Sequence, residues 1–318
     1  VAGFGEFTAG YNNYLFVTFT GRQEAVSVLS PENRSYFYPG VSSSFVFSDA
    51  IAALKNNSTF SYGKVYASYN KTGNVVVEPY QLQNVYSQSN GFPYGNLPGF
   101  SLGTSDANPN LKPEFVTTLE VGTQLSFFQN RLNLEAAYVD AKTTDGTILA
   151  DISAGSGFTS AWVNAFQASN KIIELNINGD VIQRGDLVWN VGANLTHITS
   201  EVEEIYGGID QLFHFRQNYL IVGKPYNSYM FTDYKRDPQG RVIVDPTTGN
   251  PVSGSKLYYG GTGTPPYQLG LNTSLQYKGF QLGAQFDWRM GAVVYTEAAA
   301  RMISDGTSPL TTQYGREP

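Results

Sequence analysis

The sequence has no cysteine, and only two of its 318 residues are histidine. The missing thiols exclude disulfide bonds and thiolate metal sites, and two imidazoles are too few for a histidine-rich metal centre. Charged residues make up only 14% of the chain, and the net charge of −6 provides no basic surface for nucleic acid. No run of 18 apolar residues occurs, so the sequence predicts no transmembrane helix.

Glycine and aromatic residues, in contrast, are abundant. The chain contains 33 glycines, 22 tyrosines and 20 phenylalanines. This composition favours long β-strands that are joined by tight reversals. A mean hydropathy of −0.24 is usual for a soluble protein. It also fits a membrane barrel, because polar positions that face the lumen offset the positions that face lipid.

A stretch from Asn108 to Asp145 predicts a long hairpin. Pro109 and Pro113 favour extended geometry at the residues before them, so the chain enters the first arm already shaped as a strand. Apolar residues then alternate with polar ones on both sides of a reversal at 128–131: Leu119, Val121, Leu125 and Phe127 before it, Leu132, Leu134, Ala136 and Tyr138 after it. Such alternation indicates strands whose two faces meet different environments. Each arm has about ten residues, a length that crosses a bilayer as a tilted strand.

The same alternation recurs along the chain and predicts about ten strands. The other candidates cover 1–11, 14–21, 35–48, 61–70, 170–182, 187–202, 269–277 and 280–289. Short connections, at 12–13, 49–60, 129–130, 183–186 and 278–279, alternate with long ones, at 22–34, 73–112, 144–169 and 203–266. Outer-membrane barrels show this pattern, because their periplasmic turns are short and their extracellular loops are long. The predicted fold class is therefore all-β, an antiparallel transmembrane β-barrel.

The order of several motifs resembles that of the SusC/RagA-like TonB-dependent transporters of Bacteroidetes outer membranes. The motifs are N-P-N-L-K-P-E from Asn108, F-F-Q-N-R-L-N-L from Phe127, V-G-K-P-Y-N-S-Y from Val222 and D-W-R-M-G from Asp287. Phe166, Ile172 and Ala292 stand where glycine is usual in that family. These departures leave the strands intact and concern the local loop conformation only.

The resemblance implies that residues 1–318 are part of one transmembrane β-barrel domain. Plugged transporters have 22 strands, so we expect the N-terminal plug, the early strands and the last strands to lie outside this chain. The implied function is TonB-dependent active import of oligosaccharides or oligopeptides across the outer membrane, and not catalysis. The implied partners are a SusD-like surface lipoprotein and, through the missing N-terminal part, TonB with ExbB and ExbD.

Motifs for catalysis and cofactor binding are missing from the sequence. It contains no G-x-S-x-G, Walker A, H-E-x-x-H or dinucleotide-binding pattern. The carboxylates of Glu201, Glu203, Glu204 and Asp210 are of a type that calcium accepts, but their spacing matches no EF-hand loop. We therefore expect no cofactor and no metal. Asp287 and Arg289 share the polar face of one strand and predict a lumen-facing ion pair.

Aromatic residues in the long loops are the better candidates for ligand contacts. Their flat faces and polar tips suit stacking on sugar rings or contact with peptide side chains. The alternative is that they pack the loops together or belong to an interfacial girdle. The candidates are Tyr80, Tyr86, Phe92, Tyr94, Phe100, Phe158 and Trp162.

Other classes of protein also fit parts of this pattern. A passive porin would share the strands and lack a plug. A β-rich adhesive or binding protein would be soluble without detergent. An outer-membrane enzyme would need catalytic residues from strands that this chain does not contain. The choice between oligosaccharide and oligopeptide cargo is not encoded in the strand pattern.

Overall fold

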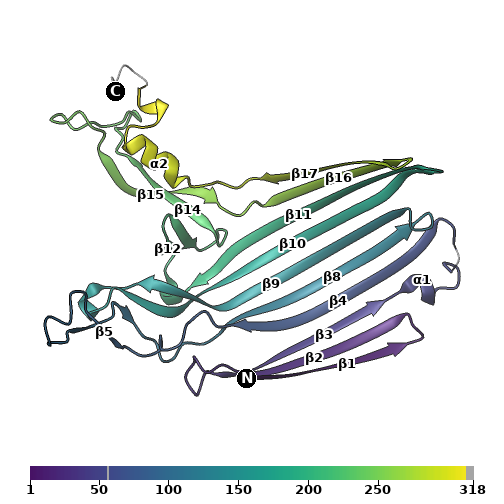
Figure 1. Cartoon of the computed structure of the whole chain (residues 1–318), viewed down its shortest axis with the longest axis horizontal. Helices are drawn as coiled ribbons and strands as arrows, with labels where there is room; N and C mark the ends of the chain where they lie inside the picture. Colours follow the sequence, from purple (N-terminus) through teal and green to yellow (C-terminus); the bar gives the residue numbers. More distant parts are fainter. Residues whose placement is uncertain (56, 313–318) are drawn as a thin grey trace.

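Ten long antiparallel strands form one curved sheet in the computed structural model, which describes residues 1–55 and 57–312 (Figure 1). Each strand pairs with the next long strand in the chain, so the order along the sheet is the order in the sequence. The strands are β1 (Ala2–Tyr11), β2 (Leu15–Ala25), β3 (Ser35–Phe45), β4 (Phe60–Asn74), β8 (Glu114–Phe127), β9 (Leu132–Asp151), β10 (Ser160–Arg184), β11 (Leu187–Ile205), β16 (Tyr267–Tyr277) and β17 (Phe280–Met290). The predicted antiparallel sheet of about ten strands is thereby confirmed.

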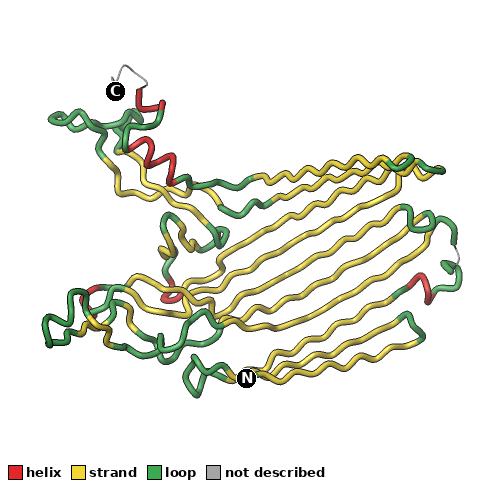
Figure 2. Tube along the Cα trace, in the orientation of Figure 1, coloured by secondary structure: helices red, strands yellow, loops and turns green. Residues whose placement is uncertain are grey.

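All the short connections lie at one end of the sheet, and the long ones lie at the other (Figure 2). Asn12 and Asn13 both have positive φ, 49° and 60°, in the three-residue turn between Tyr11 and Leu15, and asparagine tolerates this backbone conformation. Lys278 and Gly279 form the last turn in the same way, with φ of 45° and 87°. The connection from β3 to β4 contains the single-turn helix α1 (Phe47–Ala50).

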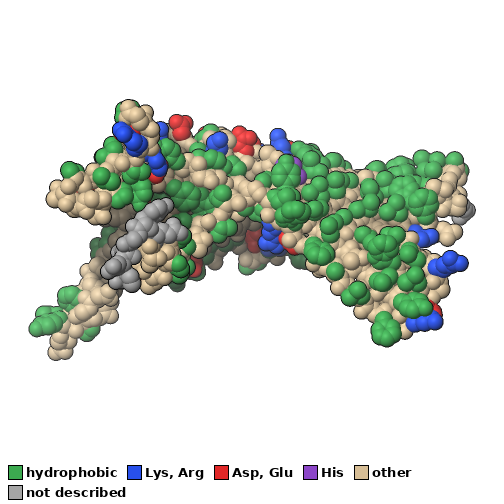
Figure 3. Space-filling model, turned by 90° about the horizontal axis from the view of Figure 1, so that it is seen from above, with side chains coloured by type: hydrophobic (Ala, Val, Ile, Leu, Met, Phe, Trp, Pro, Cys, Tyr) green, Lys and Arg blue, Asp and Glu red, His purple; other side chains and the backbone are tan. Residues whose placement is uncertain are grey.

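One face of the sheet is apolar from edge to edge, because directly paired residues of neighbouring strands point the same way. One row of paired residues consists of Phe7, Phe19, Val41, Tyr69 and Leu119. A second row consists of Ile177, Ala193, Leu271 and Phe286. These large apolar side chains are exposed, with 65% of Phe7 and 65% of Phe286 accessible. Figure 3 shows hydrophobic side chains crowded over the right-hand part of the molecule, with charged ones near the middle of the view and at its right-hand edge.

Aromatic side chains mark both limits of this apolar face. Near the short turns they are Tyr11, Phe45, Phe127, Tyr277 and Phe280, and towards the other end they are Tyr69, Tyr138, Tyr267 and Trp288. Strand β16 runs from one set to the other in 11 residues, and a tilted strand of that length covers roughly 25 Å, the height of the apolar band of an outer-membrane barrel. The opposite face carries polar residues in one row, Glu6, Thr20, Asn70 and Thr118, with Gly40 between Thr20 and Asn70.

Three strands continue well beyond the apolar band, and this corrects the predicted loop at 144–169. Strands β9 and β10 pair up to Asp151 and Ser160, which leaves only residues 152–159 between them. The ring of Phe166 occupies the space above Gly146, where any Cβ would collide with it. Phe166 also belongs to a buried cluster with Ile148, Val202 and Leu220. This local core keeps a glycine- and serine-rich segment extended.

The other long connections also contain more regular structure than predicted. Strand β2 takes up part of 22–34 by running to Ala25. The connection at 73–112 holds β5 (Tyr86–Gln88), β6 (Phe100–Leu102) and β7 (Ser105–Asp106). The connection at 203–266 folds into a four-stranded sheet of β12 (Gln211–Phe215), β13 (Asn218–Ile221), β14 (Ser228–Tyr234) and β15 (Ser253–Thr262). Helix α2 (Glu297–Ser304) follows β17, and none of the helices described is long and apolar enough to cross a membrane.

Candidate functional site

The loop before β8 is fastened to the sheet at its base by Asn164 of β10. The Asn164 amide donates to the carbonyl oxygens of Lys112 at 2.9 Å and Asp145 at 2.8 Å, and its own oxygen accepts from the Lys112 N–H at 3.0 Å. Asn108 likewise donates to the Trp162 carbonyl at 3.1 Å. The N-P-N-L-K-P motif is therefore an anchor that fixes where the loop leaves the sheet.

A small apolar core lies beneath this anchor. Leu111 is only 1% exposed and packs with Leu29 and Val77. Trp162, one of the predicted ligand contacts, packs against this cluster from β10. Its indole therefore joins the loop at 26–34 to the loop before β8, and little of it faces outward. The sequence does not distinguish this packing role from ligand contact, because both use a half-buried aromatic residue.

Four of the predicted aromatic contacts on the loop before β8 have most of their surface exposed. Tyr80 is 82% exposed, Tyr94 78%, Tyr86 71% and Phe100 63%. Tyr86 and Phe100 lie on the same face of the β5–β6 ribbon, since Tyr86 pairs with Leu102 and Gln88 pairs with Phe100. Such large exposed apolar surfaces are characteristic of interaction sites.

The remaining two predicted aromatics are less exposed, although 44% of Phe92 is still accessible. Phe92 covers Gly99, because a Cβ on that glycine would lie 2.5 Å from the ring. Phe158 is partly buried in the 152–159 connection. Tyr80 instead lines a cavity of about 590 Å³ together with Val28, Leu82 and Pro109. Tyr80 therefore lines this cavity, and the other predicted aromatic residues do not.

A larger cavity, which the sequence reasoning missed, lies on the polar face of the sheet towards the loop end. It measures about 820 Å³ and is lined by residues of β1 to β4, among them Phe4, Glu6 and Asn70. In its wall Arg22 and Glu24 form an ion pair, with Nη2 2.9 Å from Oε1. Because β2 continues through both residues, their i, i+2 spacing places them on one face of the strand.

Tyr38 closes one side of this cavity. Only 7% of it is exposed, because its ring occupies the space above Gly73 and packs against Phe115 at 6.3 Å between centroids. The Lys71 ammonium lies 4.2 Å from the centre of the same Phe115 ring. Pairing between β3 and β4 ends at Gly40 and Asn70, although both strands continue. The cavity lies where the two strands separate.

The sequence analysis also singled out one ion pair and one cluster of carboxylates. Asp287 and Arg289 lie on the polar face of β17, with Nε 3.2 Å from Oδ1, and both side chains are largely exposed. Of the four clustered carboxylates, Glu203 pairs with Lys142 at 2.6 Å and Glu204 accepts from Gln167 at 3.0 Å. The hydrogen bond from Lys142 holds the pKa of Glu203 below its usual range. Within residues 1–55 and 57–312, no three carboxylates or imidazoles converge as a metal site.

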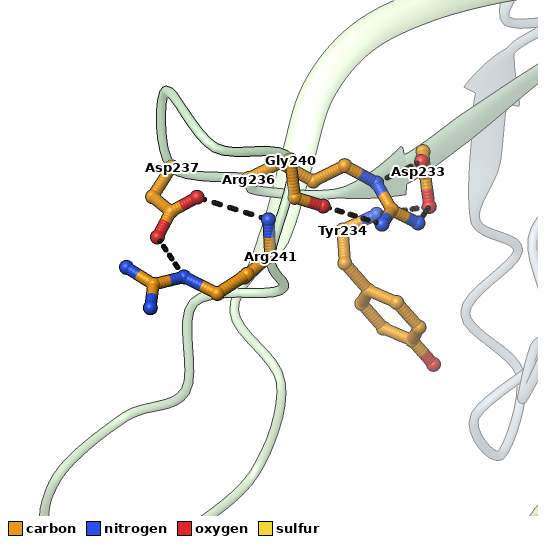
Figure 4. A network of polar contacts seen from close by, with 6 residues as sticks. All are labelled: Asp233, Tyr234, Arg236, Asp237, Gly240 and Arg241. Carbon is orange, nitrogen blue, oxygen red and sulfur yellow. Dashed lines mark hydrogen bonds and ion pairs between the residues drawn. The ribbon is translucent and has the colours of Figure 1, made fainter.

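The segment between β14 and β15 is stiffened by its own polar contacts (Figure 4). Asp237 accepts from the backbone N–H of Arg241 at 2.9 Å and from its side chain at 2.7 Å. Arg236 connects Asp233 with the carbonyl of Gly240, at 3.0 Å in each case. Isolated bridges between Arg236 and Val242 and between Val244 and Pro251 also join this segment to itself.

Residues 1–316 match the family model of the TonB-dependent receptor-like β-barrel. The chain belongs to this family. It is 26% identical over 318 residues to TonB-dependent receptor P26 of Formosa agariphila, an alignment that covers 92% of the chain and 32% of the relative. It is 24% identical to TonB-dependent receptor SusC of Bacteroides thetaiotaomicron, with 94% of the chain and 32% of the relative covered. The chain therefore spans about a third of the length of these relatives.

Solved structures agree with this assignment at the level of the fold. The RagAB peptide transporter superposes with a TM-score of 0.77 at 23% identity, over 91% of this chain and 33% of that one. The protein is thus a SusC/RagA-like outer-membrane β-barrel, as the sequence predicted. Its apolar face is the lipid-facing surface and its polar face is the lumenal surface. By the same rule, the short turns face the periplasm and the long connections face outward.

Proposed function

We propose that this chain is part of a TonB-dependent importer that carries oligosaccharides or oligopeptides across the outer membrane. The observation that carries the proposal is the pairing of a continuous lipid-facing surface with a lumenal surface that contains a cavity of about 820 Å³. A structural or adhesive protein has no need for a polar interior of that kind. The relatives named SusC and the RagAB peptide transporter support import as the activity.

A SusD-like surface lipoprotein is the partner that fits the outer end. The exposed rings of Tyr80, Tyr86 and Tyr94 provide aromatic anchors, which are enriched where protein interfaces bind most strongly. The Asn164 anchor holds their loop at a fixed place on the sheet. A loop fixed in this way loses less conformational entropy when a lid closes on it. We propose no catalytic role for the chain and no cofactor.

Uptake in living cells tests the proposal directly. The complete transporter gene would be restored to a strain that lacks it, and uptake of labelled oligosaccharides and of labelled peptides would be followed with and without a protonophore. We expect uptake that stops when the proton gradient collapses, and a lipoprotein that copurifies in mild detergent. Uptake that continues without the gradient would instead identify a passive porin. Recovery of the protein from the soluble fraction would contradict the barrel.

The partner needs a separate control. Replacing Tyr80, Tyr86 and Tyr94 together by serine would remove the exposed rings without touching the anchor or the sheet. We expect less lipoprotein to copurify with this variant, at an unchanged amount of barrel in the outer membrane. Undiminished copurification would show that the lid binds elsewhere.

A further inference from the structure

The lipid-facing surface carries two cations at the rim of two neighbouring hairpins. Strands β10, β11, β16 and β17 lie side by side, and their short turns lie at the same end of the sheet (Figure 1, Figure 2). The last directly paired residues before these turns form one row across the four strands: Arg184, Leu187, Tyr277 and Phe280. The next row on the same face is entirely apolar or aromatic and consists of Ile182, Trp189, Leu275 and Leu282. Arg184 therefore lies at the border of the apolar face, level with the aromatic residues that limit it.

The second cation of this rim is Lys278, in the turn between β16 and β17. Its ammonium lies 5.4 Å from the centre of the Tyr277 ring, beside the row that contains Arg184. In the described part of the chain neither Arg184 nor Lys278 takes part in an ion pair, and both are exposed. At the turn between β8 and β9, in contrast, the Arg131 guanidinium donates to the carbonyl oxygen of Asp180 at 3.1 Å. Arg184 and Lys278 are therefore left to bind an anion from outside the chain.

The two cations lie close enough to bind one anion together. Arg184 and Tyr277 are two strands apart, which places their backbones roughly 10 Å from each other. Leu187 is the one residue between them in the row. Arginine and lysine keep their stems on apolar surface while their charged heads reach polar surroundings, so both heads can meet over Leu187. Asp186 is the only carboxylate in the turn at 183–186, so the two turns together carry two cations and one carboxylate.

The surface next to these cations becomes apolar towards the middle of the bilayer. Aromatic rings at the limit of the apolar band lie at the level of the lipid headgroups, so the position of Tyr277 brings Arg184 and Lys278 within reach of lipid phosphates. Deeper in the apolar face, Trp189 donates its indole N–H to the Thr273 hydroxyl at 2.9 Å, which leaves the apolar part of the ring for acyl chains. Strands β10, β11 and β16 are each paired on both sides, so no further strand of a closed barrel separates these residues. The surface thus changes from charged to apolar in the same order as a phospholipid does.

We propose that Arg184 and Lys278 bind the phosphate of an anionic phospholipid in the periplasmic leaflet of the outer membrane. Guanidinium and ammonium groups form charge-assisted hydrogen bonds with phosphate oxygens, and these bonds are stronger than those between neutral groups. A zwitterionic headgroup fits less well, because its own ammonium balances the phosphate charge and adds a third cation to the rim. The inference goes beyond import. It rests on the assignment of the lipid-facing surface alone, so either one can fail without the other.

Photocrosslinking of lipids to the complete transporter in nanodiscs tests the site. The nanodiscs consist of phosphatidylcholine with a small share of photoactivatable phosphatidylglycerol or, in a parallel sample, of photoactivatable phosphatidylcholine. Mass spectrometry then counts the crosslinks on residues 182–189 and 275–282. We expect more crosslinks there from phosphatidylglycerol than from phosphatidylcholine. Below saturation, Arg184→Gln and Lys278→Gln should each lower the phosphatidylglycerol signal about fivefold, the factor that one cation contributes near a charged lipid surface.

Two further variants serve as controls. The Lys256 ammonium lies over the Tyr258 ring at 5.2 Å, as that of Lys278 lies over Tyr277, but it belongs to β15 of the outer sheet. Lys256→Gln therefore makes the same change of charge far from the rim and should leave the crosslinks unchanged. Arg184→Lys keeps the charge and should keep most of the phosphatidylglycerol signal.

Several outcomes would overturn the lipid site. Equal crosslinking of the two lipids in the parent would show that apolar contact alone holds them. An unchanged phosphatidylglycerol signal in Arg184→Gln and Lys278→Gln would show that the cations take no part, and so would an equal loss in Lys256→Gln. Displacement of the lipid by dissolved glycerol phosphate would identify a site for free phosphate, and crosslinks between two copies of the chain at the same residues would identify a second copy as the occupant. The amount of heat-resistant barrel shows whether each variant has assembled.

Discussion

Tyr66 of β4 lies across Gly122 of β8 on the lumenal face, and its phenol oxygen is 3.1 Å from Oε1 of Glu120. A Cβ on Gly122 would be only 2.5 Å from the phenol end of the ring. Because Gly122 has no side chain, the Tyr66 ring can lie over it and reach the carboxylate of Glu120. Glycine inside a strand commonly marks such a close approach.

We predict that Gly122→Ala lowers the stability of the barrel by about 1–3 kcal/mol, because the methyl group displaces the Tyr66 ring. Urea unfolding in detergent micelles measures the loss. The matched control is Gly283→Ala, since the nearest atom to a Cβ there is 3.8 Å away. In a Tyr66→Ser background the Gly122→Ala loss should disappear. If it persists there, the conformation of the glycine backbone and not the ring is responsible.

Asn164 offers a second test, at the base of the outer loop. Asn164→Ala removes four hydrogen bonds, one of them to the Thr147 hydroxyl, and leaves the carbonyl groups of Lys112 and Asp145 without that donor. We expect a local loss of about 1–3 kcal/mol and faster protease cleavage between residues 75 and 112. Asn110→Ala, at an exposed position of the same loop, should cleave at the parental rate. Equal cleavage of the two variants would show that Asn164 does not hold the loop.

The strands were predictable because the two faces of the sheet differ so sharply. Leu269 and Leu271 alternate with polar residues, and the same holds for Phe286 and Trp288 on the paired strand. The reversal at Lys278 and Gly279 is equally visible. Each strand lies between the bilayer and the lumen, so apolar and polar residues alternate along it. This alternation is visible in the local sequence and is enough to predict the strands.

The outer region was less predictable because its strands are held by contacts distant in sequence. Gly146 and Ser153 suggest a loop, but Phe166 packs on Gly146 and keeps the chain extended. The lumenal cavity was missed for a similar reason. Arg22 and Glu24 were assigned to a polar connection, whereas β2 continues through both of them to Ala25. Only pairing with Tyr36 and Tyr38 of β3 reveals this.

The orientation of the sheet can be tested by one pair of neighbouring residues on β17. Phe286 points to lipid and Gln285 to the lumen, and they pair with Leu271 and Asn272 respectively. Phe286→Lys should lower the free energy of unfolding by about 2–4 kcal/mol, because it places a charge in the apolar band. Gln285→Lys should cost much less, since the lumenal surface is polar. Folding into lipid vesicles, followed by the heat-resistant band on gels, compares the two. The opposite order would invert the assignment of the faces.

His214 gives a pH-dependent prediction in the outer four-stranded sheet. His214 belongs to β12, and the centre of its imidazole ring lies 6.2 Å from the centre of the Tyr226 ring. In the part of the chain that the structure describes, Nδ1 is buried without a hydrogen-bond partner. Burial therefore lowers the pKa of His214 below its ordinary value. The folded sheet favours neutral His214, so the unfolded chain takes up the proton first as the pH falls.

Stability of this sheet should accordingly be constant above the ordinary histidine pKa of about 6.5 and decline below it. Hydrogen exchange of the β12 and β13 amides, corrected for the intrinsic pH dependence of exchange, should show protection falling between about pH 7.5 and 5.5. His214→Gln cannot take up a proton in this range and should remove the pH dependence. His197→Gln is the control, because His197 lies on the long sheet in β11 and stacks on Tyr267. An unchanged decline in His214→Gln would assign the titration to another group.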